Sequence, residues 1–500
     1  MLSHSPPLPL IINYDLERLL SANEEEGILL ALQKHNRVRR FRLCAPTSTT
    51  LDKFLAVMNG SFPLLDHLGL CIEHSSPDWY ENKGDRVDLS RLPQSFQAPR
   101  LRQLDLRWVG HVTEVRLPLL ATLTNLAYLA LAITPTSRYL LPDYLTSCLT
   151  LIPRLMHLDL TFELYIPSDD VAWGLIYSPN MKRIALSNLT RFFFEGLSSY
   201  LEALAAQISA PHITTFKATF LDRPSSTLPH LSGLLTAAVG LRFPVARIRF
   251  PSTCVRNPKL SRVTIRMASS EQTLGCWPHF PSFRMVFPSE SPYTHAIYTG
   301  LICAVLTPVL SAVERLHFCF KGVCCMPPQK YHVEDARWHD LLRPFCKVKK
   351  LWVDSGLWVL SRALSPYENG PSMEILSELR KILRPDGRRF GAAFDEFIAA
   401  RRDAGQRIVK RWHTPVLYSD NEGSEGEEHE DESESHGEED EEQEDNERVV
   451  ALGFEDEMGE AEEGRSNVDT KPDIDYEADD DPGILTEIDS DSDFDSESKS

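Results

Sequence analysis

Residues 98–106 read APRLRQLDL, and residues 152–160 read IPRLMHLDL. In both stretches a proline-containing turn precedes the spacing apolar-x-x-apolar-x-apolar, formed in the first by Leu101, Leu104 and Leu106. The last two apolar residues lie two positions apart, so they point to one face of a short strand, while the first enters the preceding turn. We therefore predict a short strand with one buried face at each stretch.

The same spacing recurs along the chain at first-position intervals of 25 to 36 residues. The clearest copies are Val38/Phe41/Leu43, Leu65/Leu68/Leu70, Leu101/Leu104/Leu106, Leu126/Leu129/Leu131, Leu155/Leu158/Leu160 and Met181/Ile184/Leu186. Weaker copies are Ile213/Phe216/Ala218, Leu260/Val263/Ile265, Val313/Leu316/Phe318 and Val348/Leu351/Val353. Helical spacing of apolar residues predicts helices in the intervals, at residues 50–58 and 198–208. One strand and one helix per interval are typical of a leucine-rich-repeat-like unit, whose apolar face is buried only when units stack.

The predicted fold class is therefore α/β: an irregular leucine-rich-repeat-like solenoid over residues 1–412, followed by a disordered acidic C-terminal tail over residues 413–500. The spacing loosens to 47 and 53 residues around 222–312, where we expect an irregular region. The asparagine or cysteine that follows the strand in regular repeats is mostly missing. A helix over residues 392–400, with Phe394, Phe397 and Ile398 on one face, is expected to cap the core. A generic α/β domain with leucine-rich strands is the alternative.

The charge of the chain is divided unevenly. The 500 residues have a net charge of -20, but residues 419–500 alone hold 36 acidic and 4 basic residues, a net of -32. The rest holds 48 basic and 36 acidic residues, a net of +12. The acidic segment is too poor in apolar residues to offset its ordering entropy, which predicts disorder.

The acidic segment carries two kinds of short pattern. Five serines have an acidic residue three positions on, as an acid-directed kinase requires: Ser419, Ser424, Ser435, Ser490 and Ser492. Two apolar islands flanked by acids, residues 449–452 and 484–488, fit short strands that a ubiquitin-like modifier could bind by edge addition. Both patterns also arise by chance in a segment of this composition, and chance therefore remains an alternative to a functional role.

Cysteine and histidine usage gives no clear chemical site. The ten cysteines form no C-x-x-C pair, and the N-terminus has no secretory signal pattern, so reduced thiols in the cytoplasm or nucleus are expected. His317, Cys319, Cys324, Cys325 and His332 cluster, but their spacing matches no zinc module. Neither a nucleotide-binding nor a hydrolase motif is present, so we predict neither enzyme nor cofactor.

Two uncharged eighteen-residue stretches, residues 117–134 and 296–313, could be read as membrane spans. Their polar and proline interruptions favour buried elements of the repeat instead. We therefore expect no membrane association.

The candidate protein-binding face is the strand face opposite the buried apolar residues. Its members are predicted by geometry to be Arg40, Arg42, Arg102, Asp105, Arg107, Asp159 and Thr161. Basic residues crowd residues 37–42 and 347–350, and such a surface could hold nucleic acid, an acidic protein or the acidic segment of this chain. No nucleic-acid-binding module accompanies them, so we do not expect nucleic acid, and the alternative is that these scattered basic residues only keep the solenoid soluble.

The body resembles fungal F-box proteins with irregular leucine-rich repeats, especially those of mushroom-forming basidiomycetes. The matching stretches run from PPLPLIINY (6–14), through FLAVMNGSFPLLDHLGL (54–70) and SSYLEALAAQISAPHITTFKATF (198–220), to FDEFIAARRDAGQRIVKRW (394–412). The resemblance implies that the concave face of the repeats receives a substrate, while a preceding F-box docks a Skp-type adaptor of a cullin–RING ubiquitin ligase. Only five residues precede PPLPLIINY, where the resemblance implies an F-box of about forty, so we expect either that the sequence starts too late or that this member has lost its adaptor-binding module.

Three functions therefore stay open. The first is a ubiquitin-ligase substrate receptor or its remnant. The second is a repeat-only scaffold that binds a protein partner. The third is a nuclear factor whose acidic segment binds basic partners such as histones.

Overall fold

The computed structural model describes the chain from residue 8 to residue 412 with gaps. The described residues are 8–14, 21–45, 48–72, 95–109, 123–133, 142–162, 183–224, 228–250, 262–274, 280–288, 292–320, 335–353, 360, 375–384 and 392–412. They all belong to one compact unit, residues 1–424. The predicted disordered tail, residues 413–500, lies outside the described residues.

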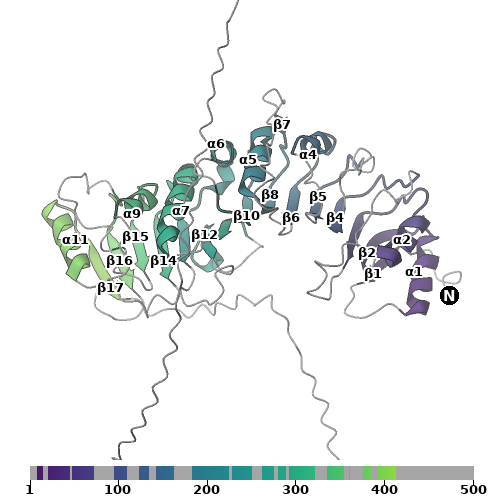
Figure 1. Cartoon of the computed structure of the whole chain (residues 1–500), viewed down its shortest axis with the longest axis horizontal. Helices are drawn as coiled ribbons and strands as arrows, with labels where there is room; N and C mark the ends of the chain where they lie inside the picture. The colour runs from purple at the N-terminus through teal and green to yellow at the C-terminus, as the bar shows by residue number, and fades with distance from the viewer. Residues whose placement is uncertain are drawn as a thin grey trace, which may run out of the picture. The chain divides into compact units, whose positions relative to one another are not determined.

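The described part of the chain is a mixed α/β structure built on one large sheet (Figure 1). In chain order its 15 strands are β1 (Leu10–Tyr14), β2 (Val38–Ala45), β3 (His67–Ile72), β4 (Gln103–Val109), β5 (Tyr128–Ile133), β6 (His157–Phe162), β8 (Arg191–Gly196), β10 (Thr215–Phe220), β11 (Val245–Phe250), β12 (Arg262–Ala268), β13 (Ser282–Pro288), β14 (Arg315–Phe320), β15 (Lys350–Val353), β16 (Lys381–Arg384) and β17 (Val409–Trp412). The described helices are α1 (Ala22–Leu32), α2 (Ser48–Val57), α4 (Pro142–Leu149), α5 (Ser198–Gln207), α6 (Pro229–Ala237), α7 (Pro292–Val305), α8 (Thr307–Leu310), α9 (Asp335–Leu342) and α11 (Ala392–Asp403). Two short strands, β7 (Ile184–Ala185) and β9 (Ile208–Ser209), pair separately.

Each repeat copy begins with a turn that fixes the next strand. Leu65, Leu101, Leu126 and Leu155, the first apolar positions of four copies, are buried. The turn carbonyl of one copy accepts hydrogen bonds from two consecutive N–H groups of the next copy, as the Asp66 carbonyl does from residues 102 and 103 at 2.9 and 3.0 Å. Because the backbone groups are satisfied by the neighbouring copy, each repeat needs the next one to be stable.

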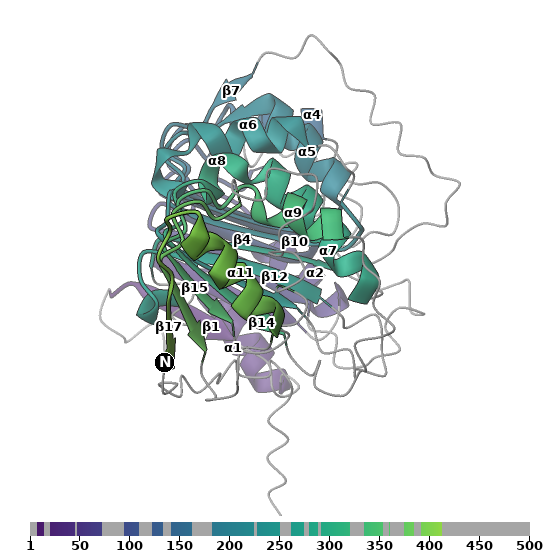
Figure 2. The same ribbon diagram turned by 90° about the vertical axis from the view of Figure 1, so that its left-hand side faces the viewer.

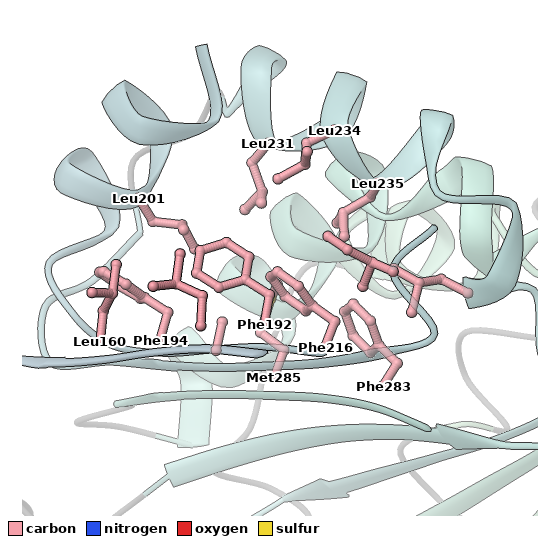
Figure 3. Close-up of a cluster of buried hydrophobic side chains, with 14 of the residues drawn as sticks. Leu160, Phe192, Phe194, Leu201, Phe216, Leu231, Leu234, Leu235, Phe283 and Met285 are labelled. Atoms are coloured by element: carbon pink, nitrogen blue, oxygen red, sulfur yellow. The ribbon is translucent and has the colours of Figure 1, made fainter. Parts of the chain in front are cut away.

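The core lies between one face of the sheet and the helices. In Figure 3 the side chains of Phe192, Phe216 and Phe283 stand in a row on the sheet, below the leucines of α5 and α6. The Phe216 ring centroid lies 5.7 Å from that of Phe192 and 5.3 Å from that of Phe283. The predicted helices at 50–58, 198–208 and 392–400 are present as α2, α5 and α11. Phe394, Phe397 and Ile398 of α11 are buried, as predicted.

The order of the strands is inverted in one region. The sheet runs β1-β2-β3-β4-β5-β6-β8-β10-β13-β12-β11-β14-β15-β16-β17. β12 is antiparallel to both β11 and β13, whereas the other neighbouring pairs of the sheet are parallel. As a result β13, rather than β11, is the neighbour of β10. The region where the spacing of the repeat loosens, residues 222–312, contains this inversion.

Two predicted repeat copies are wrong. Of the predicted copy Met181/Ile184/Leu186, Met181 lies outside the described residues, and Ile184 lies on β7, outside the large sheet. The strand that continues the ladder is β8, and its copy is Leu189/Phe192/Phe194, with all three residues buried. The two matches begin eight residues apart and fit the same spacing, so the sequence alone allowed either of them. Val263 and Ile265 do lie on a sheet strand, but β12 is antiparallel and therefore not a repeat unit.

The cysteines are not all reduced, contrary to expectation. Cys44 and Cys71 occupy paired positions of β2 and β3 and form a disulfide, with their Cα atoms 4.5 Å apart. Both residues lie on the same face of adjacent strands, which brings their sulfur atoms within bonding reach. Spacing in the sequence could not show this pairing. The described cysteines with free thiols are Cys148, Cys303, Cys319 and Cys346.

Within the described ranges, no helix is both long and apolar enough to span a membrane. The stretch 296–313 forms the end of α7, α8 and the turn before β14. The described part of 117–134 contains β5.

Candidate functional site: the open face of the sheet

The sheet face opposite the core, here called the open face, carries the functional candidates. Along β6 the exposure alternates between half-buried His157, Asp159 and Thr161 and buried Leu158 and Leu160. The apolar residues of each strand point toward the helices, so the alternate residues point to the open face. Figure 2 shows the strands stacked below the helix layer of α4, α5, α6 and α9.

Strand register aligns one open-face residue of each strand from β2 to β17 in a continuous line, here called the central row. Starting at β2, it reads Arg42, Gly69, Asp105, Ala130, Asp159, Phe193, Lys217, Arg284, Arg266, Arg247, His317, Trp352, Leu383 and Arg411. Neighbouring members lie on hydrogen-bonded strands, so adjacent side chains are about one strand spacing, 4.8 Å, apart. After Arg42, the members of the row have small or acidic side chains as far as Asp159, and those in its middle are basic.

The acidic part of the row is a connected cluster on β4, β5 and β6. Asp105 Oδ1 lies 3.1 Å from Arg107 Nε. Arg107 also hydrogen-bonds the Tyr128 side chain, and burial together with the charges of Asp105 and Asp159 raises the pKa of Tyr128 to about 12. Burial likewise raises the pKa of the Asp159 carboxyl, against the opposing effects of Lys217 and Arg107. On the central row, the two acidic side chains of this cluster, Asp105 and Asp159, therefore flank the small side chain of Ala130.

An aromatic cluster lies beside these carboxylates. The His157 ring packs edge-on between Tyr128, at a centroid distance of 4.5 Å, and Phe193, at 4.7 Å. Burial and, to a lesser extent, the charge of Arg191 together lower the pKa of His157 to about 4. His157 is therefore neutral at pH 7 and acts as a packing residue of the open face.

From β10 to β17, the charged residues that the described strands place on the open face are all basic. They are Lys217, Arg247, Arg249, Arg262, Arg266, Arg284, Arg315, Lys350, Lys381 and Arg411. The turn after β12 adds one acidic residue, Glu271, whose Oε1 lies 3.3 Å from Arg315 Nη1. Desolvation and then the charges of Arg411 and Lys350 lower the pKa of Lys381, which reflects the positive field of this surface.

Four of these basic residues occupy consecutive positions of the central row. Lys217 pairs with Arg284, Arg284 with Arg266, and Arg266 with Arg247. We call these four residues the basic row. At its far end Arg247 Nε lies 3.0 Å from His317 Nδ1, and the His317 ring packs 5.2 Å from Trp352. The arrangement can hold a linear anion across several strands.

The structure places six of the seven predicted binding residues on the open face. Asp105, Arg107, Asp159 and Thr161 come together on β4 and β6, while Arg40 and Arg42 lie on β2, nearer the edge of the sheet. Arg102 is exposed in the turn one residue before β4, so Gln103 occupies the corresponding strand position. Gln103 Oε1 lies 2.7 Å from His67 Nδ1 on β3.

Some of the basic residues that crowd residues 37–42 and 347–350 form ion pairs with acidic residues of the turns. Arg39 Nε contacts Asp66 Oδ2 at 2.8 Å, and Arg40 Nε lies 3.5 Å from Asp66 Oδ1. Lys349 Nζ contacts Glu314 Oε1 at 2.8 Å. The first two pairs connect β2 to the turn before β3, and the third connects the turns before β14 and β15. The basic row, in contrast, was not predicted from the sequence. Its members come from positions 217, 284, 266 and 247, and only the inverted strand order makes them neighbours.

The described residues hold no group of three or more His, Cys, Asp or Glu side chains that could bind a metal ion. His317 and Cys319 share the open face of β14, as predicted from their spacing. The other members of that cluster, Cys324, Cys325 and His332, lie outside the described residues.

Comparisons with known proteins show a weak similarity to a leucine-rich-repeat protein. No model of a known protein family matches the chain, and no curated protein sequence does. Among solved structures, the chain is similar to the leucine-rich repeat-containing protein LegL7 from Legionella pneumophila. The two are 12% identical, and the match covers 62% of this chain and 92% of that one with a TM-score of 0.21.

Proposed function

We propose that this chain is a leucine-rich-repeat-type protein-interaction module that binds its partner on the open face of the sheet. The observation that supports the proposal is the central row, which presents charged and aromatic side chains in register across the strands from β2 to β17. Trp, Tyr and Arg side chains carry much of the binding energy of protein interfaces.

Affinity purification of the full chain, read by mass spectrometry, tests this proposal. Arg191→Glu and Thr161→Arg change open-face positions of β8 and β6. Arg343→Glu changes an exposed residue next to α9 on the helix side, and serves as the matched control. We expect the first two variants to lose specific partners that the control retains. If both open-face variants retain the partners and Arg343→Glu loses them, binding is assigned to the helix side instead.

The resemblance to F-box repeat proteins supports a narrower role, the substrate receptor of a cullin–RING ubiquitin ligase. In that role the same purification, from cells expressing the natural locus, would recover a Skp-type adaptor. Recovery of open-face partners without any adaptor would leave a repeat-only binding module.

A further inference from the structure

We propose that the basic row binds an extended acidic protein segment that carries apolar side chains at both ends. This inference rests on the proposed function and names the chemical class of its partner. The basic row is the part of the open face where Lys217, Arg284, Arg266 and Arg247 follow one another on β10, β13, β12 and β11.

Charge and geometry favour a carboxylate-rich ligand for this row. The four residues occupy paired positions of neighbouring strands and form a line of positive charge, which carboxylates along an extended segment complement. Three of the four residues are arginines, whose planar guanidinium groups bind carboxylates through two parallel hydrogen bonds. All four side chains are half-buried, so their charges are less screened by solvent than those of exposed residues.

Apolar and aromatic side chains flank the basic row in register. Phe193 precedes Lys217 on the central row, and Trp352 and Leu383 follow His317 on the other side. Six strand steps separate Phe193 from Trp352. At about 4.8 Å per step the span is about 29 Å, which an extended segment of about nine residues covers. The partner therefore needs acidic residues in its middle and apolar anchors eight or ten positions apart, an even number that places both anchors on one side of an extended chain.

The same pattern favours a protein segment over single-stranded nucleic acid. Single-stranded nucleic acid is held by aromatic platforms that alternate with basic residues, because each base stacks on a ring while phosphates bind cations. Here the four cations are consecutive and the rings lie at the two ends of the row. That distribution matches an acidic peptide with terminal apolar anchors.

A suitable probe peptide is ILTEIDSDSDFD, the sequence of residues 484–495. Its Ile484 and Phe494 lie ten positions apart, and Asp489, Asp491 and Asp493 lie between them. In an extended chain Ile484, Ser490, Ser492 and Phe494 share one side, so phosphates on the two serines point to the same side as the apolar anchors. Ser490 and Ser492, which have acidic residues three positions on, allow the same probe to be made with two phosphates.

The experiment measures fluorescence anisotropy of the labelled peptide titrated with the full chain and its variants. All proteins in the titration, wild type included, carry Ile484→Ser and Phe494→Ser in their own chain, so that their own copy of the sequence does not compete with the labelled peptide for the basic row. We expect Arg266→Glu and Arg284→Glu each to weaken binding by about tenfold or more, as expected for loss of a charge-assisted hydrogen bond. Phosphorylation of Ser490 and Ser492 tightens binding. Replacing Ile484 and Phe494 of the peptide by serine weakens it.

Two controls keep the result interpretable. Arg343→Glu makes the same charge change outside the open face and leaves peptide affinity unchanged. Arg266→Gln removes the charge without reversing it and, with thermal unfolding of each variant, separates lost binding from lost folding.

Undetectable peptide binding, or equal affinity of wild type, Arg266→Glu and Arg284→Glu in folded protein, would overturn this inference. A twelve-nucleotide oligothymidylate that binds the basic row more tightly than the phosphorylated peptide would also overturn it and assign the surface to nucleic acid. If Arg191→Glu removes cellular partners while Arg266→Glu leaves peptide binding intact, this inference fails and the proposed function stands.

Discussion

Arg266 of β12 and Arg284 of β13 occupy directly paired positions of two antiparallel strands, on the sheet face that no described helix covers. Lys217 and Arg247 extend the pair on either side. The sheet thus concentrates positive charge along a line perpendicular to its strands. The electrostatic consequences of this line of charge can be tested by changing the ionic strength, by mutation and by changing the pH.

Peptide binding to the basic row is expected to depend strongly on salt. At 0.1 M salt the screening length is about 10 Å and it shortens as salt is added, so attraction between the row and an acidic peptide weakens. Raising sodium chloride from 50 to 300 mM should lower the affinity of residues 484–495 by about tenfold or more. Anisotropy at four salt concentrations measures the slope, and a slope of zero would contradict an ionic contact.

Loss of the disulfide should destabilise the N-terminal strands. Cys44 and Cys71 close a loop with a sequence separation of 27 residues. For a loop of this size Cys44→Ala is expected to lower the free energy of unfolding by about 3 kcal/mol. Urea denaturation without reductant measures the loss, and the control is Cys346→Ala, which removes an exposed free thiol. Equal stability of wild type with and without reductant would refute the prediction.

The phenylalanine row of the core should be sensitive to truncation. Phe216 is fully buried and packs against the rings of Phe192 and Phe283. Phe216→Ala is expected to cost about 3–5 kcal/mol of unfolding free energy, because it leaves a cavity and removes ring contacts. Phe216→Leu keeps most of the volume and should cost less. Val239→Ala, at an exposed apolar residue, is expected to change little in the same urea titration.

Glu202 should stabilise the start of α6 from the neighbouring helix. Its Oε1 accepts a hydrogen bond from the His230 N–H at 2.6 Å, and its Oε2 accepts one from the Leu231 N–H at 2.8 Å. Glu202→Ala leaves two N–H groups unsatisfied at a helix N-terminus and should cost about 1–3 kcal/mol. Thermal unfolding checks the loss. Glu202→Gln keeps one acceptor oxygen and should retain part of the stability.

Acid should destabilise the open face through His157. Its pKa in the folded chain is about 4, below the ordinary histidine value of 6.5. Between pH 6.5 and 4 the unfolded chain therefore binds a proton that the folded chain does not, and stability falls as pH is lowered through this window. Urea midpoints at pH 7 and pH 4.5 measure the effect. His157→Phe keeps the aromatic packing and should reduce the difference between the two midpoints.

The repeat could be predicted from the sequence because it depends on local rules. A turn followed by leucines two positions apart is visible wherever the chain builds one unit, as at residues 98–106 and 152–160. At residues 181–194 two matches to this rule begin eight residues apart, and the sequence alone allowed either of them. Side-chain alternation then correctly placed Asp105, Arg107, Asp159 and Thr161 on one face.

Features that depend on long-range strand order could not be predicted. The disulfide requires the register of β2 against β3, and the basic row requires β13 to lie beside β10. Sequence spacing carries no signal for either. The arginines at residues 37–42 are close in sequence and predicted a basic binding surface, yet Arg39 and Arg40 contact Asp66 in a turn.

The inverted strand order also bears on how the chain is made. A ribosome releases β10 before β11, β12 and β13, but the partner of β10 is the last of the three. Until residue 288 has emerged, the hydrogen-bonding edge of β10 is unfilled, and unpaired edges are prone to pairing with other chains. Strands β1 to β10 can join one by one as they are synthesised, whereas β11 and β12 are connected to β10 only through β13. We therefore expect vectorial folding to pause at β10 until β13 has been synthesised.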